Sequence, residues 1–190
     1  EAFNQSLSKA SYSAFELYKH YEYMHNLATA GKYHETLDMD RKLPVVPSNH
    51  VWTLSDLEAT QYFRHHALGL SYSALAQAKQ NNPEEDISYF EKGINHLATY
   101  IKNCGSFSSQ VESCQQRMTW HRLEIYRELG DMHAAYYVFK TDLNNPTVIV
   151  PFVREAIHAY QEALKYVEAC ILLTRQHALK TGDQGIHGIK

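Results

Sequence analysis

The sequence predicts an all-α fold of antiparallel helical hairpins, and three observations support that prediction. Apolar residues recur at three- and four-residue spacing along most of the 190-residue chain, which is the spacing of one helix face. The eight glycines and five prolines mostly stand between these periodic segments, where they act as breakers. No segment shows convincing alternation of apolar and polar residues, and Val148, Ile149 and Val150 form a strand-like run too short for a sheet.

Periodicity and breakers together predict about seven helical segments. Gly31 ends the first segment, and Pro44 follows the second. Thr53 or Ser55 is suited to cap the third. The fourth begins with three acidic residues that complement the helix dipole. The expected segments are residues 6–30, 32–42, 53–80, 84–104, 109–129, 131–145 and 151–180.

The later segments are delimited by a glycine turn and by prolines. Gly130 and Asp131 are expected to turn the fifth segment back into the sixth. Pro151 suits the first turn of the seventh, because proline is tolerated where no backbone donor is needed. We expect residues 1–180 to form a single domain and residues 181–190 to form a flexible C-terminal tail.

Composition and charge exclude several classes of protein. A hydrophobic fraction of 44% with 21% charged residues is typical of a globular domain and argues against disorder. The net charge is −3 and the basic residues are scattered, so the chain lacks the basic face that nucleic-acid binding requires. No run of 18 apolar residues occurs, and we therefore expect no membrane insertion.

Residues 126–139 carry the clearest repeat-like pattern. A helical tyrosine precedes the Gly-Asp pair, and Ala135 is followed four positions later by Phe139. Parts of the same pattern recur at other predicted hairpins, in residues 31–37, 68–97 and 155–164. Gly69 and Gly93 are the expected close-contact residues of one such hairpin.

These four fragments resemble the tetratricopeptide repeat, although none of them keeps the full length of that repeat. In that family a small residue lets two helices approach and a large one fills the gap beside it. The resemblance implies a short, degenerate solenoid of three stacked hairpins and a terminal helix. A plain helical bundle is the alternative architecture.

In a stacked array, the first helix of each hairpin lines the concave face, and that face is the expected binding surface. Aromatic and arginine side chains contribute most to binding energy at such surfaces. The mixed lining suits a protein or peptide segment, or a small polar ligand. The candidate residues are Tyr18, Tyr21, His25, Phe63, His66, Leu70, Ser73, Arg117, Trp120, Glu124 and Arg127.

Catalytic and metal chemistry find little support in the sequence. Two Glu-x-x-His sets, ending at His25 and at His158, put a carboxylate and an imidazole on one helix face, as di-iron proteins require. The additional glutamates of such proteins are not evident. His65 and His66 are adjacent, so their side chains diverge and cannot chelate together. We expect no catalytic residues, no cofactor and no metal.

Three cysteines leave the redox compartment open. Cys104 and Cys114 flank a polar connection, and a disulfide closing that loop would stabilise the fold by roughly 2–3 kcal/mol. Two unrelated thiols are the alternative, and they would be expected in a cytosolic protein. Cys170 lies on an apolar helix face and is expected to be an inert core residue.

The leading functional prediction is a non-catalytic protein- or peptide-interaction module. The alternative is an extracytoplasmic, periplasmic ligand-sensing domain of a bacterial signalling protein, such as a diguanylate cyclase or a histidine kinase. The long terminal helix and a start at Glu1 rather than Met favour that alternative, because they suggest a processed protein or part of a longer one. A helical metal-binding protein is the third possibility.

Overall fold

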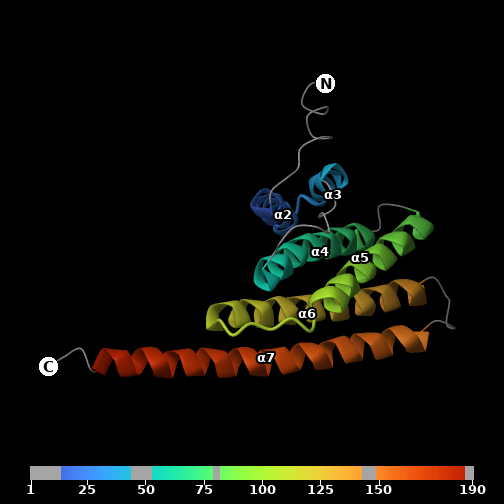
Figure 1. Cartoon of the computed structure of the whole chain (residues 1–190). Helices are drawn as coiled ribbons and strands as arrows, with labels where there is room; N and C mark the ends of the chain where they lie inside the picture. The colour runs from blue at the N-terminus through green and yellow to red at the C-terminus, as the bar shows by residue number, and fades with distance from the viewer. Residues whose placement is uncertain (1–13, 44–52, 79–81, 143–148, 187–190) are drawn as a thin grey trace, which may run out of the picture.

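A computed structural model of the chain describes residues 14–43, 53–78, 82–142 and 149–186. Six helices and no strand lie within them, which confirms the predicted all-α class (Figure 1). The helices are α2 (Ala14–Thr29), α3 (Tyr33–Lys42), α4 (Leu54–Gln77), α5 (Pro83–Cys104), α6 (Glu112–Asp142) and α7 (Ile149–Ile186). The predicted loop between Pro44 and Pro47 lies outside the described residues.

Local chemistry sets the ends of several helices. Gly31, which follows α2, has a φ of +78°, a left-handed conformation that glycine adopts without steric cost. The Thr53 hydroxyl caps α4 by accepting a hydrogen bond of 3.1 Å from the backbone N–H of Asp56. The Asn82 side chain caps α5 in the same way, at 2.9 Å from the N–H of Glu85. The predicted end at Gly31 and the predicted cap at Thr53 are confirmed.

The predicted turn at Gly130 is wrong, because α6 runs without interruption from Glu112 to Asp142. A Cβ atom at Gly130 would lie 2.7 Å from the Tyr160 ring of α7. This glycine therefore permits close packing of α6 against α7 rather than a reversal of the chain. Two expected segments merge into one, so the described residues hold six helices where the sequence predicts about seven.

Helix α7 is longer than the sequence predicts. It contains Pro151 in its first turn, as expected, and continues to Ile186 rather than ending near Lys180. Residues 181–186, predicted to belong to a flexible tail, are helical. None of the described helices has a stretch long and apolar enough to cross a membrane.

Each described helix packs against its neighbours in the sequence, and α4 also meets both α2 and α6. Helix α4 contacts α2, α3, α5 and α6, whereas α7 contacts α6 alone among the described helices. Figure 1 shows α7 as the outermost helix, running alongside α6. At the α4–α5 contact, a Cβ atom on Gly69 would fall 2.5 Å from Leu97. The close-contact role predicted for Gly69 is confirmed.

The interior between α4, α5 and α6 contains a large apolar cluster. We call Phe90, Leu97, Met132, Tyr136 and Phe139 the apolar cluster, and all five are buried. The Phe90 and Tyr136 rings stack with centroids 4.9 Å apart. The sequence predicts that Phe139 packs the 131–145 segment back against the 109–129 segment, but both segments belong to α6 and the Phe139 ring contacts Phe90 of α5.

Cys104, Cys114 and Cys170 are free thiols in this structure, so of the two alternatives that the sequence leaves open, it contains Cys104 and Cys114 without a bridge. Cys104 is buried at the end of α5, and burial raises the pKa of its thiol to about 12. Cys114 and Cys170 are half-buried, and burial also raises the pKa of the Cys170 thiol. An elevated pKa keeps a thiol protonated and unreactive.

Candidate functional site

A row of polar side chains follows one face of α4 into the centre of the molecule. Glu58, Tyr62 and His66 are four residues apart and all three are buried. Four-residue spacing places side chains one above the other on a helix. Because α4 also contacts α2, α5 and α6, groups from those helices meet this row. We call the resulting set of Glu58, Tyr62, His66, Tyr100, His121 and His25 the polar network.

Glu58 is the deepest member of the polar network, with its side chain entirely buried. Its Oε1 atom accepts a hydrogen bond of 2.5 Å from the Tyr100 hydroxyl and lies 2.9 Å from Nδ1 of His121. A buried carboxyl group is tolerated only when it is hydrogen-bonded in this way. Burial and the nearby carboxyl group of Glu58 raise the pKa of Tyr100, so its hydroxyl keeps the proton that it donates.

Tyr62 joins the two halves of the polar network through ring contacts. Its ring stacks on His121 with centroids 3.7 Å apart and an angle of 6° between the planes. On its other side it lies 5.0 Å from the His66 ring. Burial and nearby carboxylates raise the pKa of Tyr62. The aromatic planes therefore hold His121 and His66 in fixed positions without a direct hydrogen bond between them.

His25 of α2 and His66 of α4 form the outer pair. Nε2 of His25 lies 3.0 Å from Nδ1 of His66, a hydrogen-bond distance at which one ring donates and the other accepts. Burial lowers the pKa of His25 to about 4 and that of His66 to about 3. Both imidazoles are therefore neutral at pH 7. The Nε2 atom of His66 is buried without a hydrogen-bond partner among the described residues.

Next to the polar network lies a more exposed set of residues, which we call the rim. Tyr18 of α2 makes an edge contact with Phe63 of α4, with centroids 5.5 Å apart, and both are half-buried. Arg127 of α6 donates to Glu124 at 2.9 Å and to Asp131 at 3.2 Å. The rim, Tyr18, Phe63, Glu124, Arg127 and Asp131, thus combines two aromatic rings with two carboxylates and one guanidinium.

The structure brings together a part of the residue set predicted from the sequence. The ring centroid of His25 lies within 5.4 Å of the ring centroids of Phe63 and His66. Burial lowers the pKa of His66, and the charge of Arg127 lowers it further. The predicted residues Tyr18, His25, Phe63 and His66 are joined by ring contacts between α2 and α4. Arg127 and Glu124 pair with each other on α6.

Other predicted residues lie elsewhere. Tyr21 is fully buried, and its ring faces the Arg64 guanidinium at 5.8 Å. Ser73 is buried and accepts a hydrogen bond from Gln77. Leu70 packs against the apolar residues between α2 and α4. These three residues stabilise the fold and are not part of the rim.

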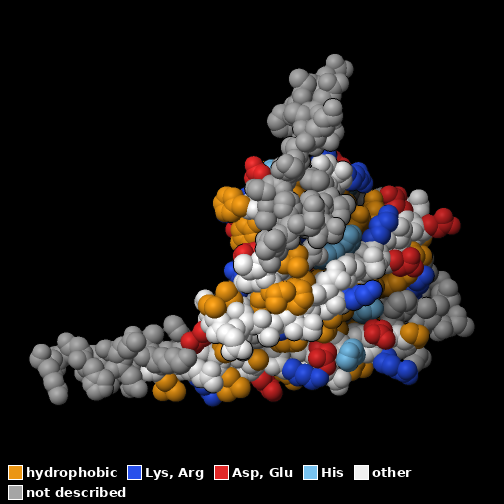
Figure 2. All heavy atoms as spheres, in the orientation of Figure 1, with side chains coloured by type: hydrophobic (Ala, Val, Ile, Leu, Met, Phe, Trp, Pro, Cys, Tyr) orange, Lys and Arg blue, Asp and Glu red, His pale blue; other side chains and the backbone are white. Residues whose placement is uncertain are grey.

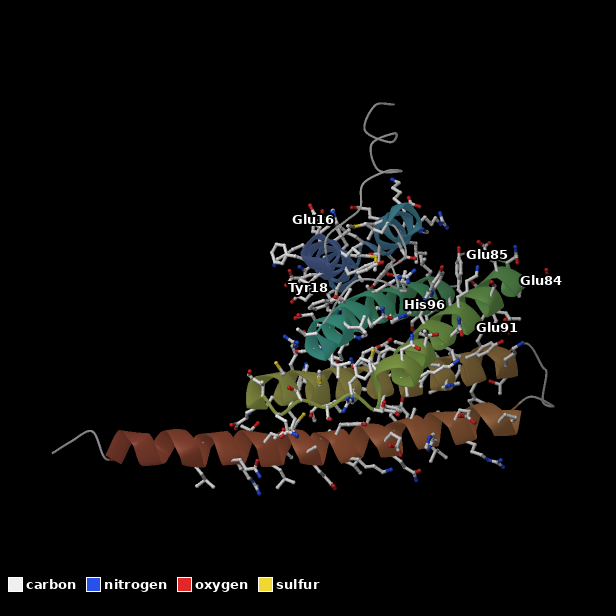
Figure 3. All side chains as sticks on the ribbon, in the orientation of Figure 1. Glu16, Tyr18, Glu84, Glu85, Glu91 and His96 are labelled. Atoms are coloured by element: carbon white, nitrogen blue, oxygen red, sulfur yellow. The ribbon has the colours of Figure 1, made fainter. Side chains whose placement is uncertain are left out.

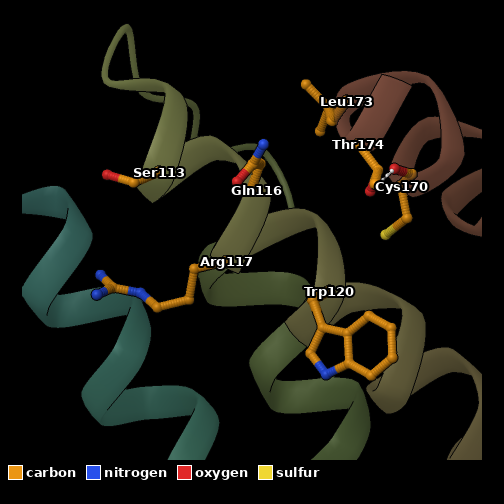
Figure 4. A pocket seen from close by; sticks show the side chains of 7 residues that line it. All are labelled: Ser113, Gln116, Arg117, Trp120, Cys170, Leu173 and Thr174. Carbon is orange, nitrogen blue, oxygen red and sulfur yellow. Dashed lines mark hydrogen bonds between the residues drawn. The ribbon is translucent and has the colours of Figure 1, made fainter. Parts of the chain in front are cut away.

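Arg117 and Trp120 line a separate pocket between α6 and α7. The pocket has a volume of about 380 Å³ (Figure 4). Trp120 is 54% exposed, while Arg117 reaches α4, where it donates to the backbone oxygen of Ser55 at 3.0 Å. We call this the α6–α7 pocket, and its lining is Ser113, Gln116, Arg117, Trp120, Cys170, Leu173 and Thr174.

A second histidine pair lies between α4 and α5. Nδ1 of His65 is 3.2 Å from Nδ1 of His96, and His96 stacks on Tyr72 with an angle of 6° between the rings. Figure 3 labels His96 between these two helices. His65 and His66 thus contact different helices, which confirms that they cannot chelate together. No group of three metal-ligating side chains is found in the part of the chain that the structure describes.

Sequence reasoning missed four members of the polar network: Glu58, Tyr62, Tyr100 and His121. One signal was available, because Glu58, Tyr62 and His66 recur every four residues on a predicted helix. Glu58 is entirely buried, so it cannot touch a bound molecule in this conformation. The polar network is therefore suited to hold the rim in place, and the rim is the part that can contact a partner.

The assignment of the rim as the candidate site rests on the geometry of the structure, because comparison with known proteins adds nothing to it. No protein-family model, curated protein or solved structure matches the chain.

Proposed function

We propose that this chain is a non-catalytic, tetratricopeptide-like binding module that holds a peptide segment of a partner protein against the rim. The pattern of helix contacts supports this proposal. Helix α4 contacts both α2 and α6. Helix α3 contacts α2 and α4, and helix α5 contacts α4 and α6. A stack of hairpins has this nearest-neighbour pattern, and in such a stack α2, α4 and α6 are the first helices that face a ligand.

The observation that carries the proposal is the composition of the rim. The rings of Tyr18 and Phe63 pair between α2 and α4, Arg127 and Glu124 pair on α6, and Phe63 lies 6.1 Å from the His121 ring of α6. Aromatic residues together with arginine contribute most of the energy at protein interfaces. Arg127 donates to the carboxylates of Glu124 and Asp131, so the α6 part of the rim has one more carboxylate than cation, while Lys19 of α2 lies 5.6 Å from the Tyr18 ring. A peptide with an apolar residue next to a lysine or arginine fits that chemistry.

The polar network supports the proposal by fixing the backbone beneath the rim. His25 and His66 join α2 to α4, and Glu58 joins α4 to α5 and α6 through Tyr100 and His121. Binding to a preorganised surface costs less conformational entropy than binding to a mobile one.

A peptide-display selection tests the proposal. Random-sequence peptides are selected against the whole chain, and an enriched peptide is then titrated against variants by fluorescence anisotropy. Tyr18→Ala and Asp131→Lys are expected to weaken binding at least about tenfold. Glu84→Lys is the matched control, because Glu84 is exposed at the start of α5, away from Tyr18 (Figure 3). Equal binding to all variants, or no enrichment, would contradict the proposal.

The α6–α7 pocket favours a second candidate function, the sensing of a small polar ligand. Its volume of about 380 Å³ falls in the range of small-molecule sites. The exposed indole of Trp120 offers a stacking surface, and Ser113, Gln116 and Thr174 offer polar groups. A panel of small polar metabolites tests it by thermal shift: a ligand of this pocket raises the Tm of the native chain but not that of Trp120→Ala. Equal shifts for both proteins would place the ligand elsewhere.

A further inference from the structure

Helix α7 projects beyond the body of the molecule at its C-terminal end. It pairs antiparallel with α6, since Tyr160 donates to Asp131 at 2.7 Å and Tyr166 stacks on Tyr126. If the same antiparallel pairing of residues continues along both helices, Glu112 at the start of α6 lies beside the region around Leu179 of α7. Figure 1 shows α7 extending past that point. The second half of α7 therefore has α6 on one side and no other described helix against it.

The outward side of this half of α7 is apolar. Leu164, Ile171, Leu172 and Leu179 have exposed fractions of 59%, 46%, 57% and 72%, which are high values for four large aliphatic side chains on one helix. Leu164 and Ile171 are seven residues apart, as are Leu172 and Leu179, and at 100° per residue all four fall within a sector of about 100°. Hydrophobic side chains are visible along the lower edge of α7 in Figure 2, with charged side chains between them. Exposed apolar surface of this kind marks an interaction site.

Two opposite charges lie within the same strip of surface. Glu168 and Arg175 are exposed, and at 100° per residue they point in the same sector as the four aliphatic residues. They stand seven residues apart, too far to pair with each other along the helix. Neither has an ion-pair partner among the described residues. We call Leu164, Glu168, Ile171, Leu172, Arg175 and Leu179 the α7 stripe.

The α7 stripe is complementary to itself when the chain direction is reversed. Two antiparallel copies centred between Ile171 and Leu172 bring together residues at equal steps from that centre. Ile171 then faces Leu172 of the second copy, and Leu164 faces Leu179. Glu168 faces Arg175 of the second copy, and the two-fold symmetry repeats this pair. A parallel pair would instead place Glu168 against Glu168 and Arg175 against Arg175, which is repulsive.

We propose that the α7 stripe binds the α7 stripe of a second copy of this chain in an antiparallel, two-fold symmetric contact. This contact is separate from the rim and leaves α2 and α4 free to bind a partner peptide. The stripe covers four turns of helix, so the interface falls below the ~1,200 Å² of a standard protein–protein interface. The dimer is accordingly weak, and its population rises with protein concentration.

Sedimentation-velocity ultracentrifugation of the full chain, in the presence of a reductant, tests this proposal over a concentration series. Glu168→Arg and Arg175→Glu each place like charges opposite one another twice and are expected to weaken self-association at least about tenfold. A mixture of the two single variants restores both ion pairs, and it is expected to associate like the native chain. Arg154→Glu is the control: this exposed residue of α7 lies outside the stripe, and the change should leave association unaltered.

The neutral variant Glu168→Gln reports the direction of the two helices. In the antiparallel contact it removes an attraction and weakens association, whereas in a parallel contact it would remove a repulsion and strengthen association. Circular dichroism confirms that each variant is folded, as expected for changes at exposed positions. A native chain that stays monomeric throughout the series, or single variants that associate as well as the native chain, would overturn the proposal.

Discussion

The polar network and the apolar cluster lie side by side around α4, α5 and α6, but they hold the helices together in different ways. In the apolar cluster, Phe90, Tyr136 and Phe139 pack by shape, and this packing is insensitive to protonation. In the polar network, the contacts of Glu58 with Tyr100 and His121 depend on which atoms carry protons. Packing in the apolar cluster tolerates small shifts of side-chain position, whereas the hydrogen bonds of the polar network require each group to be in one protonation state.

This difference bears on the proposed function. The rim rests on the polar network, because His25 and Phe63 belong to the same ring cluster as His66 and Tyr62. Phe63 packs against the core that contains Tyr62 and Tyr100 together with the apolar cluster, and against the apolar residues between α2 and α4. Damage to the polar network should therefore disturb binding as well as stability, and damage to the apolar cluster mainly stability.

The largest effect is expected for Glu58→Ala. The change leaves the Tyr100 hydroxyl and His121 Nδ1 buried without their acceptor, which costs about 3–5 kcal/mol of unfolding free energy. Urea denaturation measures this cost. In a double-mutant cycle, Glu58→Ala and His121→Ala should show a coupling of about 1–3 kcal/mol, while Glu58→Ala and Met132→Ala should add to within about 0.5 kcal/mol. Strict additivity of the first pair would refute the connected network.

A smaller effect is expected from pH. His66 and His25 have folded pKa values of about 3 and about 4, both below the ordinary value of about 6.5 for an unfolded histidine. The unfolded chain therefore binds more protons as the pH falls below about 6.5. The contribution of these histidines to the free energy of unfolding has its full value above about pH 6.5. It declines towards pH 4, by up to about 1.4 kcal/mol per pH unit for each buried histidine.

The contribution of His66 to this decline can be isolated. His66→Phe should reduce the slope of unfolding free energy against pH between about pH 6 and pH 4, measured by urea denaturation at each pH. His34→Gln is the control, because His34 is exposed on α3, and it should leave the slope unchanged. An unaltered slope in His66→Phe would show that this imidazole does not stay neutral in the fold.

The smallest effect is expected in the apolar cluster, for Gly93→Ala. The new Cβ would lie 2.7 Å from the Sδ and Cε atoms of Met132, at the flexible end of a side chain that adapts readily. Alanine also favours helix over glycine by up to about 1 kcal/mol. The two effects offset one another, so thermal denaturation should show a change of less than about 1 kcal/mol. A loss of more than about 3 kcal/mol would show that this region is as rigid as the polar network.

Much of the fold could be predicted from the sequence, because helix periodicity and capping are local properties. Gly31 and Thr53 mark helix ends, and the all-α class follows from the spacing of apolar residues. Gly130 was misread because a Gly-Asp pair looks the same whether it forms a turn or a contact. Only the position of the Tyr160 ring, thirty residues later, distinguishes the two cases.

The candidate site was less predictable, since its contacts join residues far apart in the sequence. Stacked first helices predict that Tyr18, His25 and Phe63 lie together, and ring contacts between α2 and α4 join these three residues. Tyr21 was misplaced, because a tyrosine one turn from Tyr18 can face the core or the solvent with equal helical spacing. Glu58 is hard to predict, because a glutamate is usually solvent-exposed and only its four-residue spacing from Tyr62 and His66 places it on the same helix face.

Hydrogen–deuterium exchange of the chain with and without a selected peptide tests the central claim most directly. Binding at the rim predicts slower amide exchange in α2, in the middle of α4 and in residues 120–131 of α6, with little change in α3 and at the start of α5. Protection confined to α7, or to α3 and α5, would contradict the assignment of the rim as the binding surface.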